Sequence, residues 1–182
     1  MKSNHVSKLS LRFVATLLVM FSLVLFAGCS QSPTGTDSTE SQVHVLTRMP
    51  ADGAAFKVLS YYTSETISAK DGGIIELYDV TLEVPPGAVD TDTTFSIGIP
   101  DISVFYNEFG TSGLVFNVPV TVTMSFRDAD LTGVDVSTIR IAYFNEESGQ
   151  IEDVDCRVDF ERQVVTAKLY HFSAYGLISD EQ

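Results

Sequence analysis

The chain has 182 residues and carries 24 acidic against 11 basic side chains, which gives a formal net charge of −13 at pH 7. A protein this acidic is repelled by nucleic acid and by anionic lipid headgroups, so neither is expected as an electrostatic partner.

The N-terminus has the pattern of a bacterial lipoprotein signal. Residues 1–12 hold three basic side chains and no acid, residues 13–26 are apolar except for one Thr and one Ser, and Ala27-Gly28-Cys29 follows. This apolar run is shorter than the 20 or so residues that a spanning helix needs. The small pair before Cys29 resembles a lipobox, which implies cleavage before Cys29 and lipidation of that residue. The alternative is an ordinary cleavable signal in which Cys29 is incidental.

We therefore expect residues 1–28 to be a signal peptide and residues 29–42 to be a lipidated tether. Residues 30–42 contain no large apolar side chain and cannot bury enough surface to offset chain entropy. Cleavage leaves 154 residues, enough for one domain, with eight basic against 24 acidic side chains. The resemblance predicts a bacterial envelope protein held to the membrane by lipid on Cys29. In a cell with two membranes, a Ser directly after the cysteine, as at Ser30, is similar to lipoproteins that are sorted to the outer membrane. With Cys29 lipidated, only Cys156 remains and no intramolecular disulfide is available.

From Val43 onward, apolar and polar side chains alternate in short runs that are separated by turn residues. The clearest run is 119–126, where Val120, Val122, Met124 and Phe126 alternate with Thr and Ser. Other expected strands are 43–46, 57–67, 74–84, 94–99, 114–116, 139–144, 163–171 and a last strand-forming run at 168–179, with a turn at 49–53. The one helix candidate, 103–109, is rich in aromatic and β-branched residues, which argues against a helix. This spacing predicts an all-β chain that folds as a single antiparallel β-sandwich.

Three segments carry a family resemblance. Residues 80–89 read VTLEVPPGAV, a strand running into a Pro-Pro-Gly-Ala turn; residues 114–122 read LVFNVPVTV, and residues 143–149 read YFNEESG, a candidate hairpin before the last strands. Pro85 and Pro86 end a strand by fixing φ and removing donors, and Gly87 permits a positive φ. These segments resemble the ZU-five domain shared by zonula occludens proteins, netrin receptors and ankyrins. The resemblance covers residues 69–182, leaves 43–68 as additional N-terminal strands, and implies a sandwich used for binding or scaffolding.

The tripeptide His171-Phe172-Ser173 offers one specific chemistry. Some ZU-five-like and related domains cut themselves within such a tripeptide, and the resemblance implies attack of Ser173 Oγ on the Phe172 carbonyl with His171 as general base. Cleavage requires a distorted peptide and donors for the oxyanion. In the structural alternative, His171 satisfies a buried backbone group, Phe172 fills the core and Ser173 hydrogen-bonds locally.

The remaining constellations are weaker. Asp128, Asp130 and Asp135 are faintly similar to a calcium loop, but Ile139 occupies the position of the closing glutamate, so a solvated turn is favoured. No Cys/His set has zinc spacing and no glycine-rich phosphate loop occurs, so no cofactor is expected. Glycan binding would require aromatic side chains such as Phe105, Tyr106 and Phe109 to line an exposed face.

The sequence thus predicts a membrane-anchored surface lipoprotein whose sandwich is a non-catalytic interaction or structural module for an unknown protein or cell-surface partner. The first alternative is a self-processing domain that is cut between Phe172 and Ser173. Glycan or calcium binding is a further alternative.

Overall fold

The computed structural model describes residues 43–50 and 60–180, which form two antiparallel β-sheets packed on one another. This confirms the predicted all-β sandwich. The signal peptide, Cys29 and the tether lie outside the described residues, as does most of the expected turn at 49–53. Within the described part of the chain, the only helical element is the 3₁₀ turn Val136–Thr138, and no helix is long and apolar enough to cross a membrane.

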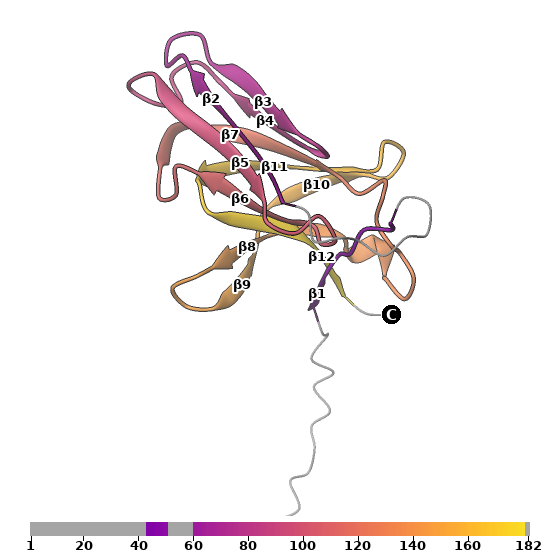
Figure 1. Ribbon diagram of the computed structural model, residues 1–182. Coiled ribbons are helices and arrows are strands. Elements are labelled where there is room, and N and C mark those ends of the chain that lie inside the picture. The colour runs from indigo at the N-terminus through magenta and orange to yellow at the C-terminus, as the bar shows by residue number, and fades with distance from the viewer. Residues whose placement is uncertain (1–42, 51–59, 181–182) are drawn as a thin grey trace, which may run out of the picture. The chain divides into compact units, whose positions relative to one another are not determined.

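The first sheet has seven strands in the order β2-β5-β6-β12-β8-β9, and β1 also pairs with β12 (Figure 1). Their bounds are β1 Val43–Val45, β2 Tyr61–Ile67, β5 Thr93–Ile99, β6 Tyr106–Gly110, β8 Arg140–Asn145, β9 Gln150–Asp153 and β12 Ala174–Asp180. β12 is central to this sheet because β8 pairs with one of its sides, while β6 and β1 pair end to end with the other. The N-terminal strands β1 and β2 are therefore part of the same sandwich.

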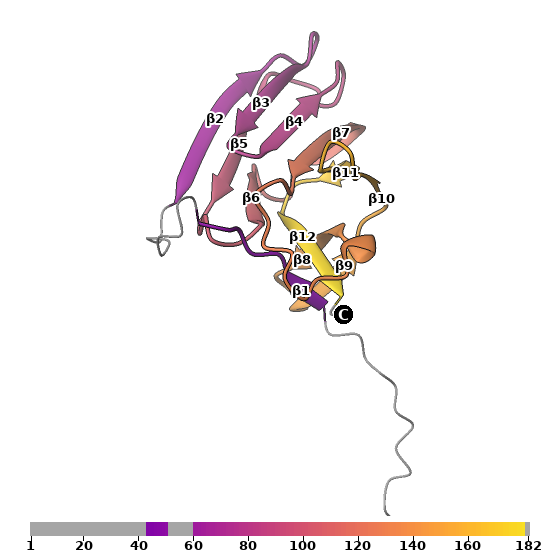
Figure 2. The same ribbon diagram turned by 90° about the vertical axis from the view of Figure 1, so that its right-hand side faces the viewer.

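The second sheet has five strands in the order β10-β11-β7-β4-β3. Their bounds are β3 Gly73–Leu77, β4 Val80–Val84, β7 Val115–Ser125, β10 Cys156–Asp159 and β11 Val164–His171. On one side of the sandwich, β3 of this sheet lies beside β2 of the first sheet (Figures 1 and 2). The opposite side carries the other two edge strands, β9 and β10.

The core lies between the sheets and follows the predicted period of two. Val120, Val122 and Met124 of β7 are fully buried, as are three residues of the facing β5, which are Phe95, Ile97 and Ile99. Strand β12 runs through the middle of its sheet and is buried on both faces from Ala174 to Ser179. Burial of this apolar surface supplies the main driving force for the fold.

Two turns show how local sequence sets the strand ends. Gly87 has a φ of +77°, which confirms that the Pro-Pro-Gly-Ala turn uses the conformational freedom of glycine. The run 74–84 is two strands instead of the single one expected, because the chain reverses at Tyr78 and Asp79. Tyr78 has a φ of +56°, and this turn contains neither Gly nor Pro that would have signalled it.

The structure has three further strands that were not among the expected ones. Segment 103–109 contains most of strand β6, in agreement with the argument against a helix there. Strands β9 and β10 were not expected, because both are short and polar edge strands, and all of β9 is exposed.

Candidate functional site

A groove of about 860 Å³ opens between the two sheets on the side where β9 and β10 lie. Its lining comes from strands β7 to β12 and from the link between β9 and β10, and it includes Tyr143, Asp155, Cys156, Lys168, His171 and Tyr175. This groove holds one of the residues predicted from sequence, His171.

The groove exists because β10 is shorter than its partner. β10 pairs with β11 only from Val164 to Ala167, and the chain before Cys156 turns away toward β9 of the other sheet. Beyond Ala167, β11 continues to His171 and pairs on its other side with β7. The edge of β11 from Lys168 to His171 therefore faces the groove with no described strand paired to it.

His171 forms part of the inner wall of this groove. Its ring packs edge-on against Tyr143 at 5.1 Å between centroids, and its Nδ1 lies 3.3 Å from the Tyr175 hydroxyl. The same hydroxyl donates to the His171 carbonyl oxygen at 3.1 Å. A phenol has one hydrogen, so this arrangement favours donation from Nδ1–H to the Tyr175 oxygen and leaves Nε2 as the acceptor of the ring.

Tyr175 is buried beneath His171, and burial has an electrostatic consequence. Desolvation raises the pKa of its hydroxyl well above the ordinary value, and the nearby Tyr143 adds to the effect. The hydroxyl therefore stays protonated and continues to donate to His171 across the neutral and mildly alkaline range.

Phe172 points away from the groove into the core. It is 1% exposed, and its ring meets those of Phe116, Phe95 and Phe109 at centroid distances of 4.7, 5.3 and 5.7 Å. Its N–H donates to the Leu114 carbonyl oxygen at 3.0 Å. The packing is that of a core residue at the corner between β11 and β12, as the structural alternative expects.

The geometry of the tripeptide supplies one element of self-cleavage and lacks another. The Phe172 carbonyl oxygen accepts a hydrogen bond of 3.0 Å from Gly113 N–H, so one donor stands where an oxyanion would form. Among the described hydrogen bonds, however, none joins the His171 ring to the Ser173 hydroxyl. All three residues also have ordinary negative φ angles, since Tyr78 and Gln163 are the described non-glycine residues with positive φ.

The three aspartates of the possible calcium loop do not converge. Asp130 accepts from Thr132 N–H at 3.0 Å, and Asp135 caps the 3₁₀ turn by accepting from Ser137 N–H at 3.0 Å. Hydrogen bonds from the Thr132 side chain and backbone lower the pKa of Asp130 below its ordinary value. No group of three or more His, Cys, Asp or Glu side chains suited to a metal ion occurs in the part of the chain that the structure describes.

The aromatic residues considered for a glycan platform are not on an exposed face. Phe105 and Phe109 are 1% and 2% exposed, and Tyr106 is half-buried against Phe144. An exposed platform at this position is therefore ruled out.

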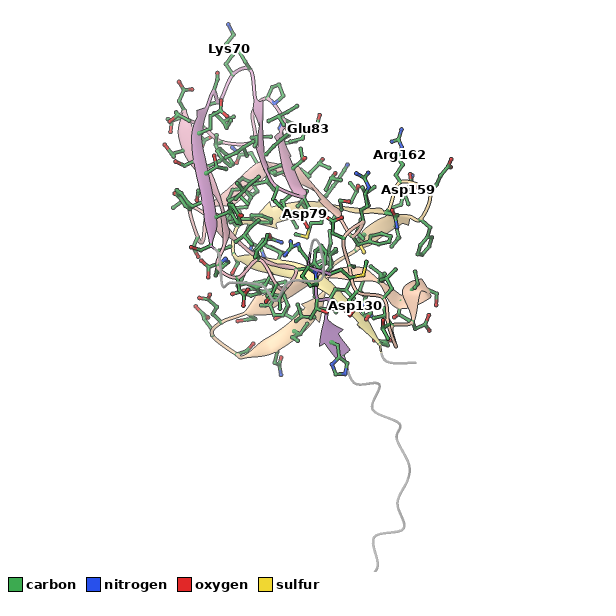
Figure 3. All side chains as sticks on the ribbon, turned by 45° about the vertical axis from the view of Figure 1, so that its right-hand side comes forward. Lys70, Asp79, Glu83, Asp130, Asp159 and Arg162 are labelled. Carbon is green, nitrogen blue, oxygen red and sulfur yellow. The ribbon has the colours of Figure 1, made fainter. Side chains whose placement is uncertain are left out.

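Sequence reasoning missed a buried ion pair between Arg48 and Asp79. Arg48 holds both Asp79 carboxylate oxygens at 2.7–3.2 Å, donates to the carbonyl oxygens of Ile102 and Val104, and stacks 4.0 Å from the Phe105 ring centroid. Figure 3 shows Asp79 near the middle of the sandwich. Desolvation raises the pKa of the Asp79 carboxyl above its ordinary value, although Arg48 acts in the opposite direction. No local signal announces this pair, since its members are 31 residues apart.

Fold and site together define a β-sandwich protein with an open groove between its sheets at one edge. The sequence matches no protein-family model, and no curated protein is found to be similar to it.

Proposed function

We propose that this chain is a lipid-anchored protein of the bacterial cell envelope whose sandwich, a ZU-five-like domain, is a non-catalytic module that binds a partner through the groove. The N-terminal pattern that ends at Cys29 supports the anchor and the envelope location, including the outer membrane in cells that have one. The observation that carries the binding role is the open stretch of β11 at the groove, where backbone and aromatic side chains are accessible together.

The chemistry of the groove favours binding over turnover. Asp153 is paired with Arg140 at 2.8 Å, the Glu152 carboxylate accepts from Asn145 at 2.9 Å, and the His171 ring is held by Tyr175. Each of these three polar groups has a structural partner, so these side chains hold the walls of the groove in place. Such walls suit the binding of a partner that is not chemically changed.

Protection of Cys156 tests this role, because Cys156 lines the groove and is a free thiol. We would measure its rate of alkylation in envelope fragments and again after detergent extraction and purification. Occupancy by a partner predicts slow alkylation in fragments and faster alkylation after purification. The matched control is a Cys156→Ser, Lys70→Cys double variant, because Lys70 lies at the tip of the loop between β2 and β3 (Figure 3). Equal rates for Cys156 in both preparations would count against binding at the groove.

The anchor is tested separately. Growth with a labelled fatty acid should label the parent chain, and a Cys29→Ala variant should carry no label. Label that persists in the variant would place the lipid elsewhere or remove this part of the proposal.

A second candidate function is self-processing, favoured by the hydrogen bond from Gly113 N–H to the Phe172 carbonyl oxygen. In this reaction Ser173 Oγ loses its proton to His171 and bonds to the Phe172 carbonyl carbon. The carbon–nitrogen bond to Ser173 then breaks, and its nitrogen takes the proton from His171, which leaves an ester. Water hydrolyses the ester to give a Phe172 carboxyl and a free Ser173 hydroxyl and amine.

Intact mass under denaturing conditions tests this candidate, with His171→Ala as the control. Loss of residues 173–182 from the parent alone would establish cleavage. A single uncleaved mass after prolonged incubation would exclude it.

A further inference from the structure

The geometry points to the class of partner that the groove receives: an extended peptide segment that adds a strand to β11 at Lys168–His171, with apolar and acidic side chains in alternation. This inference rests on the proposed binding role and specifies its partner. It follows from the unpaired strand edge, the two walls of the groove and the charges along them.

The unpaired edge determines the form of the partner. Because β11 pairs with β7 on one side and with β10 only up to Ala167, the backbone groups of Lys168 and Tyr170 point toward the groove, while those of Leu169 between them point toward β7. An extended polypeptide satisfies such groups through the ladder that a further strand would form. The groove volume of about 860 Å³ also falls within the range of about 300–1,000 Å³ that is common for ligand sites.

The two faces of β11 determine the alternation. Leu169 is 2% exposed and faces inward, where Tyr143 and Tyr175 also line the groove. Lys168 and Tyr170 face outward, and Tyr170 is 62% exposed. Residues that lie opposite one another on paired strands share a face, so the residue opposite Leu169 points into the apolar interior and its neighbours point outward. The inward positions of the partner should therefore be apolar.

The charges determine what lies at the outward positions. Lys168 and Arg157 both line the groove, and neither forms an ion pair with any described residue. On the opposite bank, Asp153 is paired with Arg140, while Glu152, whose partner Asn145 is neutral, and Asp155 keep their negative charges. Acidic side chains of the partner are thus placed on the outer side, beside Lys168 and away from Asp155.

The experiment uses the full-length chain in detergent and a blocked, fluorescein-labelled hexapeptide of alternating Val and Glu, with binding followed by fluorescence anisotropy. We expect saturable binding. Lys168→Glu should weaken it by about two- to tenfold, because a favourable exposed charge pair becomes a repulsive one. Lys70→Glu, the same charge change outside the groove, should leave the affinity unchanged. The same peptide with N-methylated backbone amides should fail to bind, because it cannot donate to the strand edge.

Equal binding of the N-methylated peptide, or equal loss in the two lysine variants, would overturn strand pairing at β11. Absence of peptide binding, with or without binding of a soluble oligosaccharide in its place, would overturn the peptide as partner. Slow alkylation of Cys156 in envelope fragments, together with no peptide binding, would retain the groove as a binding site and reject only this class of partner.

Discussion

Replacing Arg48 by Met should strongly lower the free energy of unfolding, because it breaks the buried ion pair with Asp79. The Arg48 side chain is 1% exposed and that of Asp79 is 10% exposed, so the substitution leaves a carboxylate in the interior without its partner. It also leaves the carbonyl oxygens of Ile102 and Val104 without the guanidinium donor. Removing one member of a buried ion pair costs about 3–5 kcal/mol of unfolding free energy.

The matched control is Arg140→Met. Arg140 also contacts two carboxylates, those of Asp153 and Asp180, but its side chain is 22% exposed, so water replaces the lost partners. We expect a loss of at most about 1 kcal/mol for this variant. The double variant Arg48→Met, Asp79→Leu should recover most of the stability that Arg48→Met loses, because no buried charge is left unpaired.

Urea unfolding at pH 7, followed by tyrosine fluorescence and circular dichroism, gives the three unfolding free energies. The pH dependence supplies a second check. Loss of Arg48 removes the contact that lowers the pKa of Asp79, so the pKa of the folded state rises further above that of the unfolded state. A raised carboxyl pKa favours the folded state at low pH, and this advantage is lost as the pH rises through that pKa. The Arg48→Met deficit should therefore shrink in mildly acidic buffer. A deficit no larger than that of Arg140→Met, or one that does not change with pH, would refute this reasoning.

Three further predictions test other parts of the fold. Gly176→Ala should destabilise the fold by about 1–3 kcal/mol, because the added methyl group would overlap the Phe105 carbonyl oxygen. Gly98→Ala should be tolerated, because its added methyl group would lie 3.6 Å from the nearest atom. Similar melting temperatures for the two variants would contradict this. Asn107→Leu should be neutral or stabilising by up to about 1 kcal/mol, since the Asn107 Oδ1 is buried without a hydrogen-bond partner among the described residues. A clear loss of unfolding free energy in urea would show that this oxygen is satisfied. The parent should lose stability as the pH rises above about 10, because Tyr175 then loses its proton in the unfolded state and keeps it in the folded state. Tyr175→Phe should reduce this loss. An unchanged slope of unfolding free energy against pH in the variant would contradict the prediction.

The sequence predicted the strands whose packing depends on local pattern. The alternation from Val120 to Phe126 encodes the buried face at the end of β7, and Val120, Val122 and Met124 of the strand are buried, as is Phe126 directly after it. Polar edge strands such as β9 could not be found this way, because an exposed strand has no apolar face to reveal its period.

The groove and the Arg48 clamp depend on contacts between distant segments. The groove exists because β10 begins only at Cys156, which pairs with Ala167, while β11 runs on to His171. The cause is a difference in strand length and not a sequence motif. Sequence reasoning singled out His171 for its neighbours in the chain, Phe172 and Ser173. The structure instead places the His171 ring with two tyrosines from the other sheet, a grouping that no local spacing reveals.

The most direct test of the groove as a binding site is photo-crosslinking in intact producing cells. A photoreactive phenylalanine analogue at position 170 replaces Tyr170, which is exposed and lines the groove, and the same analogue at position 70 replaces Lys70 outside it. Our account predicts a covalent adduct of defined higher mass from position 170 and none from position 70. Adducts from neither position, or the same adducts from both, would contradict it.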